Sequence, residues 1–406
     1  MDSAHYLRLS RDGYEVGSPS CAFYPLWPAV LRVGTVITGN RPVLAAVLLA
    51  NALSLVGLWL LYRLVERRCG AAVSRDSLIL LLAFPGALFF SFPYTESLYL
   101  VLLMLFFWSL ELRRWWWLAL AGFLLPLARP VGVFIVLPLA WFLFEQWRNA
   151  RSHEILESDS RVEPSNRGSR RESAPASSGF RWSGLTSAAT KLMGSLHEFG
   201  MAHPRHEAGK AGASGTGVPP VRIETHGRDA HATTKFLEKL AAHRHWLLLL
   251  CPLLGYATYF GTMYAWTGNA LEGFEAQRSY PNSPSIRNMF NVAGFANAFA
   301  NIHTLDGMLD AALDRGFFLL FLALLPAVWK VNRTWFWYTL PTGLLPALSN
   351  YFLSYRRFIM VCFPLFVVLA QMLAKGPRWM FWYYVVLLAA MQAWAVTRFV
   401  NFNWAG

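Results

Sequence analysis

Side chains that could carry out group transfer stand at four places in the chain, each beside an apolar stretch. These places are Asp2 with His5 and Tyr6, Glu96 in SFPYTES, Arg129 in LARPVG, and Arg356–Arg357 in LSNYFLSYRRF. A carboxylate can act as a general base, and a guanidinium group binds phosphate through paired hydrogen bonds. Carboxylates and arginines at the mouth of an aromatic-lined helical bundle would therefore suit transfer from a lipid phosphate to a hydroxyl acceptor.

Each of these residues also has a purely structural interpretation. Asp2 could be a solvated residue at the end of the chain, and Glu96 could favour a helix N-terminus that Thr95 caps. The three arginines could reach the membrane surface as anchors. However, an ionisable side chain at the centre of a membrane helix costs about 2.5–3.5 kcal/mol, so such residues are functional hypotheses by default.

The composition excludes a soluble enzyme. Of the 406 residues, 55% are hydrophobic and 16% are aromatic, and only 15% are charged. A soluble globular chain has about 25% charged residues. Apolar stretches of about 16–24 residues recur along the chain, and about 20 helical residues cross a bilayer core of roughly 30 Å. The sequence therefore predicts an integral membrane protein.

The net charge of +13 does not indicate a nucleic-acid partner, because most basic residues stand between apolar stretches or in one polar insert. The four cysteines, Cys21, Cys69, Cys251 and Cys362, have no metal-ligand spacing. No DxD-like acidic pair stands on the predicted outer face. Neither a disulfide framework nor a divalent metal site is therefore predicted.

We expect an all-α polytopic bundle of about ten transmembrane helices. The apolar run 115–147 is divided at Arg129–Pro130, because it would otherwise form one helix about 50 Å long, and proline disfavours helix in the residue before it. With residues 1–41 outside, every predicted inner connection is then basic, as the positive-inside rule expects. The predicted spans are 42–65, 76–92, 96–112, 115–128, 131–147, 246–266, 316–330, 334–352, 357–374 and 379–399.

Three parts follow from this topology. Residues 1–147 form an N-terminal membrane part, and residues 246–406 form a C-terminal membrane part. Residues 148–245 are rich in Ser, Gly, Ala and Arg, which predicts a disordered cytoplasmic insert. In the outer segment 267–315, apolar residues recur every three or four positions, which predicts an amphipathic helix. That helix would lie at the membrane interface or cover the end of the bundle.

Three motifs carry a resemblance to a known family. In MDSAHYLRLSRDGYE and the following AFYPLWPAVLR, the relevant positions are Asp2, Tyr6, Gly13–Tyr14 and Phe23–Pro28. This segment resembles the first outer loop of the PIG-V family, the second mannosyltransferase of glycosylphosphatidylinositol anchor synthesis, and of its bacterial relatives. FPGALFFSFPYTESLYL, with Tyr94 and Glu96, and LARPVGV, with Arg129, resemble later loops. GFEAQRSYPNSPSIRN, with Gln277, is a weaker match.

The resemblance implies a membrane glycosyltransferase of the GT-C type. Such enzymes transfer a sugar, usually mannose, from a polyprenyl- or dolichyl-phosphate donor to a lipid-linked or glycan acceptor on the extracytoplasmic or luminal face. Asp2 would then be the catalytic base. Arg129 with Arg356 or Arg357 would hold the departing phosphate, and Glu96 and Gln277 would orient hydroxyl groups. His5, Tyr6 and Tyr94 would contribute to substrate binding, and no cofactor besides the lipid-phosphate donor is implied.

The chain departs from the family pattern at its start, because the family has a membrane span before this Asp and only Met1 precedes Asp2 here. Two other hypotheses stay open. A transporter or lipid flippase would have internal repeats or broken helices with polar residues near the bilayer midplane, and a non-catalytic relative would scaffold a membrane complex. The high ratio of Arg to Lys and the short loops favour a bacterial plasma membrane over the endoplasmic reticulum.

Overall fold

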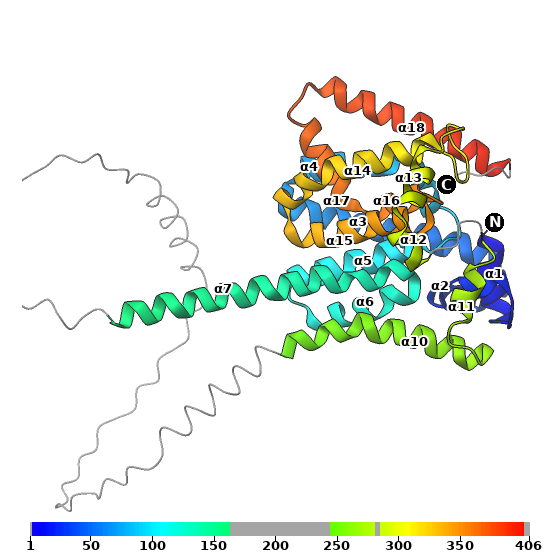
Figure 1. The fold of residues 1–406 in the computed structure, drawn as a ribbon, viewed down its shortest axis with the longest axis horizontal. Coiled ribbons are helices and arrows are strands. Elements are labelled where there is room, and N and C mark those ends of the chain that lie inside the picture. Colours follow the sequence, from blue (N-terminus) through cyan, green and yellow to red (C-terminus); the bar gives the residue numbers. More distant parts are fainter. Residues whose placement is uncertain (1, 163–243, 281–284, 402–406) are drawn as a thin grey trace, which may run out of the picture. The chain divides into compact units, whose positions relative to one another are not determined.

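The computed structural model describes residues 2–162, 244–280 and 285–401, and within these ranges it is all-α (Figure 1). The described residues contain no β-strand, and one isolated bridge joins Thr304 and Ala311. Contacts divide the chain into two units, Met1–Arg151 with Phe236–Gly406, and Ser152–Lys235. The two predicted membrane parts therefore belong to one compact unit.

The helices of the N-terminal part are short at first and then long. In chain order they are α1 (Asp2–Asp12), η1 (Pro19–Ala22), α2 (Leu26–Ile37), α3 (Pro42–Cys69), α4 (Ala71–Ala83), η2 (Pro85–Phe90), α5 (Glu96–Glu111), α6 (Trp115–Ala128), η3 (Pro130–Ile135) and α7 (Val136–Val162). Residues 148–162 of the predicted insert thus continue α7, and residues 163–243 lie outside the described part of the chain.

The C-terminal part alternates between long helices and a group of short ones. They are η4 (Arg244–Leu249), α10 (Leu250–Thr267), α11 (Glu272–Gln277), α12 (Ile286–Phe290), α13 (Val292–Ala300), α14 (Ala312–Val331), α15 (Arg333–Asn350), α16 (Tyr355–Val361), α17 (Phe363–Leu373) and α18 (Arg378–Val400).

Five helical stretches are long and apolar enough to cross a membrane, and α16 with α17 makes a sixth if this pair, bent by 72°, forms one span. The predicted number of ten is therefore not supported by the described helices, although most residues of each predicted span are helical. The remaining stretches are short or broken. The five are Pro42–Cys69, Pro130–Ser152, His245–Thr267, Ala312–Val331 and Arg378–Val400.

Prolines account for the principal breaks. Phe84 is extended before Pro85, so the predicted span 76–92 is split into α4 and η2. Arg129 is extended before Pro130, with φ −152° and ψ 148°, which confirms the predicted division of the run 115–147. The second break places Arg129 beside Glu96, the first residue of α5.

Helix α5 lies at the centre of the unit and packs against α3 and α6 (Figure 1). Most of its side chains are buried, whereas α3 buries only a face that includes Ala50, Ser54 and Gly57. A Cβ atom at Gly57 would meet the side chain of Leu100 at 2.9 Å. These small residues allow the two helices to approach closely, which is typical of helix contacts in membranes.

The segment 267–315, expected on the outer side, contains the predicted amphipathic helix as α13. Phe295 and Phe299 pack against Phe318 and Phe352, with ring centroids 5.3–6.4 Å apart among the four rings. Helix α13 therefore covers one end of the bundle with these two side chains. Val292, by contrast, is exposed.

Candidate functional site

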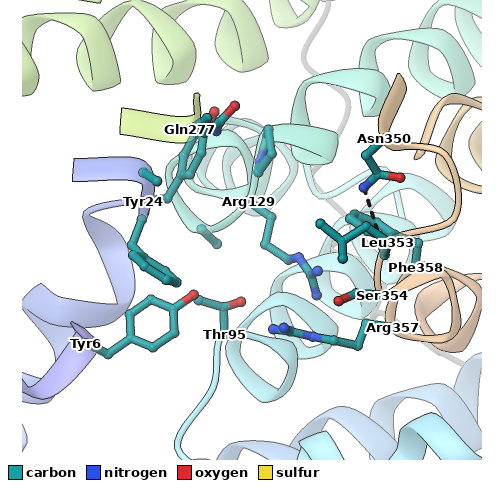
Figure 2. Close-up of a pocket in the computed structure, with 14 residues that line it drawn as sticks. Tyr6, Tyr24, Thr95, Arg129, Gln277, Asn350, Leu353, Ser354, Arg357 and Phe358 are labelled. Carbon is teal, nitrogen blue, oxygen red and sulfur yellow. Dashed lines mark hydrogen bonds between the residues drawn. The ribbon is translucent and has the colours of Figure 1, made fainter. Parts of the chain in front are cut away.

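A pocket of about 200 Å³ lies where six separate parts of the chain meet (Figure 2). Helix α1, the segment after η1, the N-terminus of α5, the α6–η3 junction, α11 and the α15–α16 connection all border it. Its polar and aromatic lining residues are Tyr6, Phe23, Tyr24, Thr95, Arg129, Gln277, Asn350, Ser354, Arg357 and Phe358. The chain thus brings together sites that are up to 350 residues apart in sequence.

Behind this lining, Glu96 joins the two arginines of the pocket. Its Oε1 atom lies 3.0 Å from Nη1 of Arg129 and 2.7 Å from Nη2 of Arg357, and it accepts a hydrogen bond from Nε of Arg357 at 2.7 Å. Glu96 is fully buried at the first position of α5. Its carboxylate therefore fixes both guanidinium groups from the protein side, where the partial positive charge of the helix N-terminus also favours it.

Glu96, Arg129 and Arg357 together carry a net charge of one positive unit, because two guanidinium groups share one carboxylate. The two guanidinium groups line the pocket. No acidic residue is among the described residues that line it. Figure 2 shows the guanidinium groups of Arg129 and Arg357 directed into the same space, opposite Tyr6 and Tyr24. Because charge interactions are strong in surroundings that exclude water, this arrangement would bind an anion with two guanidinium donors.

Aromatic rings hold both guanidinium groups in place. The Cζ atom of Arg129 lies 5.2 Å from the centre of the Phe358 ring, and that of Arg357 lies 4.7 Å from Phe89 and 4.9 Å from Tyr94. Such stacking favours the charged form and restricts the side-chain rotamers. Tyr94 therefore supports Arg357 from behind and does not line the pocket.

The wall opposite the arginines is formed by aromatic and amide side chains. Tyr24 stacks on Tyr259, with centroids 4.4 Å apart, and burial raises the pKa of its phenol well above its ordinary value, so the hydroxyl group stays neutral. Gln277 lies at the end of α11 and borders the same space. Across the pocket, the buried Oδ1 atom of Asn350 accepts no hydrogen bond from a described residue. These groups could bind hydroxyl groups of a polar ligand.

The connection from α15 to α16 has an unusual backbone where it borders the pocket. Tyr351, Phe352 and Ser354 have positive φ angles of 51°, 72° and 54°. Residues other than glycine rarely adopt this conformation, and such backbone is concentrated at functional sites. The conformation brings Ser354, Arg357 and Phe358 to the pocket in a short stretch of chain.

The structure brings four of the sequence-predicted residues to the pocket, namely Tyr6, Arg129, Gln277 and Arg357, with Glu96 directly behind them. His5 lies nearby but is turned to another partner, because its Nδ1 atom is 2.8 Å from the hydroxyl group of Ser20. Asp2 is the first residue of α1, one helical turn before Tyr6, and its side chain lies outside the described part of the structure.

Arg356 is not part of the pocket, which differs from the prediction. Its side chain is 1% exposed and contacts Asp306 and Asp314, the latter through Nε to Oδ1 at 3.0 Å. Arg398 from α18 lies 3.6 Å from the same Asp306. Arg356 therefore joins α16 to α14 and to the preceding loop, whereas its neighbour Arg357 reaches the pocket.

Sequence reasoning missed several lining residues, among them Tyr24, Thr95, Asn350, Ser354 and Phe358. Thr95, Asn350, Ser354 and Phe358 stand beside predicted residues in PYTES and LSNYFLSYRRF, and Tyr24 stands in FYPLWP, a motif that carries the family resemblance but contains no predicted site residue. The motifs were therefore a usable signal for the segments. The individual side chains were not distinguishable, because their direction depends on the backbone breaks described above.

No group of three or more His, Cys, Asp or Glu side chains that could hold a metal ion occurs among the described residues. Comparison with known proteins found no match to this chain among protein-family models, curated proteins or solved structures. The function must therefore be argued from the pocket itself.

The turn that carries Arg129 gives a first prediction. A Cβ atom at Gly132 would clash with the backbone of Leu125 and with Pro126. We therefore expect Gly132→Ala to destabilise the protein by about 1–3 kcal/mol, because backbone must move to accept the methyl group. Gly261→Ala is the matched control, since nothing lies within 4 Å of its Cβ position in α10. In detergent, the unfolding temperature should be lower than that of wild type for Gly132→Ala and unchanged for Gly261→Ala. Equal unfolding temperatures for the two variants would contradict the prediction.

Proposed function

We propose that this chain is a membrane glycosyltransferase of the GT-C type, which transfers a hexose from a polyprenyl- or dolichyl-phosphate donor to a lipid-linked or glycan acceptor. The observation that carries the proposal is the pocket with Arg129 and Arg357 on one side of it, both joined to the buried Glu96. An excess positive charge at the end of an apolar helical bundle suits a lipid phosphate.

In this proposal the two arginines stabilise the phosphate as it leaves. The acceptor oxygen attacks the anomeric carbon, the bond from that carbon to the phosphate oxygen breaks, and the lipid phosphate keeps the electron pair. The acceptor proton passes to a carboxylate, and the configuration at the anomeric carbon inverts. Negative charge develops on the departing oxygen, which is where preorganised guanidinium donors lower the barrier most.

Asp2 is the proposed base, and mannose is the expected sugar from the family resemblance. The position of Asp2 one turn before Tyr6 in α1 supports this role, because Tyr6 lines the pocket. Glu96 is better suited to positioning than to proton transfer, since its Oε1 atom contacts both arginines. Gln277, Tyr24 and Asn350 would orient hydroxyl groups of the sugar or the acceptor, on the outer side of the membrane.

The direct test is sugar transfer in membranes that contain the protein, with labelled polyprenyl-phosphate mannose as donor. We expect Asp2→Asn to lower the rate by about 100- to 10,000-fold, the usual contribution of a general base. Asp12→Asn is the matched control, because Asp12 ends the same helix and its carboxylate pairs with Arg11 outside the pocket. Equal rates of sugar transfer for Asp2→Asn and Asp12→Asn would remove Asp2 from the mechanism. If wild type transferred no sugar from any of several donors, the proposal that the chain is a glycosyltransferase would be refuted.

One observation favours a second candidate, a lipid transporter. Helices α16 and α17 are separated by Cys362 and bent by 72°, and discontinuous helices bind substrates in transporters. Arg356 and Arg357 both lie on the first half of this pair. In sealed vesicles, a transporter would move labelled lipid phosphate across the membrane without an acceptor, whereas a transferase would give product only when the acceptor is added.

A further inference from the structure

A second charged pocket lies at the other end of α5. The helix begins at Glu96, behind the first pocket, and ends at Glu111, which lines the second. The two ends are about 22 Å apart at 1.5 Å per residue. The second pocket has a volume of about 340 Å³ and is also bordered by the C-terminal end of α3, the α5–α6 turn and the middle of α7.

The charges in this second pocket are again unequal. Arg67, Arg68 and Arg113 line it together with Glu111 and Glu145. Arg68 pairs with Glu111, whereas Arg67 and Arg113 form no ion pair with any residue in the described ranges. The pocket therefore has one positive charge in excess and two guanidinium groups available to an anion.

A buried amide gives an independent indication of a ligand. The Nε2 atom of Gln146 is shielded from solvent and donates no hydrogen bond to a described residue. Leaving a buried donor without an acceptor costs free energy, so a ligand that supplies the acceptor is favoured at such a group. Gln146 lines the pocket, and a phosphate oxygen bound there could accept its hydrogen bond.

The position of the pocket indicates which class of anion it would bind. The apolar helix α3 ends at Cys69, directly after Arg67 and Arg68. Trp116 is 90% exposed just beyond the α5–α6 turn, and Trp147 is exposed next to Gln146. Exposed tryptophans beside basic residues at the end of a span are typical of the membrane–water interface, where lipid headgroups lie.

We propose that this pocket binds the phosphate headgroup of an anionic membrane lipid. Arg67 and Arg113 neutralise the phosphate, Gln146 donates a hydrogen bond to it, and the acyl chains lie along the apolar surface of α3. This site is separate from the proposed transferase pocket and does not depend on sugar transfer.

The test is lipid binding to the purified full-length protein in detergent, followed by its thermal unfolding. Phosphatidylglycerol is expected to raise the unfolding temperature at lower concentrations than phosphatidylcholine does. In Arg67→Gln/Arg113→Gln the apparent affinity for phosphatidylglycerol should fall about 25-fold, from roughly fivefold for each arginine. Gln146→Leu should also lower it several-fold, although the net charge is unchanged.

The matched control is Arg63→Gln/Arg114→Gln, which removes the same charge from two exposed positions outside the pocket at the same end of the bundle. It should leave the affinity within about twofold, since exposed charges that do not line the pocket and do not contact the phosphate contribute little. If the affinity for phosphatidylglycerol fell equally in the two double variants, or did not fall in Gln146→Leu, the proposal would be overturned and general attraction to the surface charge would be indicated. A matching response to inorganic phosphate would also overturn it, because it would indicate a site for a soluble anion.

Discussion

Replacing Arg357 by glutamine is expected to lower the proposed sugar transfer by about 100- to 1000-fold, the loss typical when one preorganised donor to a developing negative charge is removed. Two features of Arg357 support this size of effect. Its guanidinium group is held by Glu96 at 2.7 Å and by the rings of Phe89 and Tyr94, so it needs no reorganisation to meet a phosphate. The measurement is the rate of transfer from labelled polyprenyl-phosphate mannose at saturating acceptor.

Three controls separate a catalytic loss from a folding defect. Arg357→Lys keeps the charge but lacks the planar fork, so we expect an intermediate rate. Arg32→Gln removes an exposed arginine from α2 and should transfer sugar at the wild-type rate. Arg357→Gln leaves Glu96 paired with Arg129 at 3.0 Å, so its unfolding temperature in detergent should stay close to that of wild type. Wild-type transfer by Arg357→Gln would contradict the assignment of this residue to the phosphate.

The positions of the helices could be predicted from the sequence because apolar runs and prolines are local signals. The break at Arg129–Pro130 is an example, since it follows from the steric effect of one proline on the residue before it. The number of spans could not be predicted in the same way. Helices α16 and α17 are bent by 72° at Cys362. Whether such a pair bends or forms one straight span depends on packing against neighbouring helices.

The site was predictable as a set of segments but not as a set of side chains. Glu96 and Arg129 stand out in sequence because charges are costly beside apolar runs, and the structure brings them within 3.0 Å of each other. Asn350 and Tyr24 carry no such signal, because an amide or a phenol is common at a membrane interface. Their place in the pocket depends on contacts between segments that are far apart in the chain.

The adjacent residues Arg356 and Arg357 show most clearly which part of the site cannot be predicted from the sequence. Consecutive residues on a helix point about 100° apart, so both cannot face the same pocket. The sequence contains no local feature that decides which one does. In the structure Arg356 is the residue turned away from the pocket, because it pairs with Asp306 and Asp314, which lie 50 and 42 residues before it. The pair of acids thus directs Arg356 inward and leaves Arg357 for the pocket.

Replacing Arg356 by methionine is therefore expected to destabilise the fold by about 3–5 kcal/mol, because it leaves buried carboxylates without their principal counter-charge. Asp306 and Asp314 are both almost fully buried, and Arg398 lies 3.6 Å from Asp306, beyond hydrogen-bond distance. The measurement is thermal unfolding of the purified protein in detergent. Arg357→Met removes a charge from the next position in the chain and is the comparison.

The triple variant Arg356→Met/Asp306→Asn/Asp314→Asn tests the cause of that loss. Removing all three charges together avoids an unpaired buried ion, so stability should return to within about 1–2 kcal/mol of wild type, since replacing a buried ion pair by neutral groups is often close to neutral. Because Arg356 does not line the pocket, the triple variant should also retain sugar transfer, whereas Arg357→Gln should not. Unchanged stability in Arg356→Met would show that the cluster contributes little to the fold. Lost transfer in a stable triple variant would instead make Arg356 part of the site, and the two adjacent arginines would then share one function.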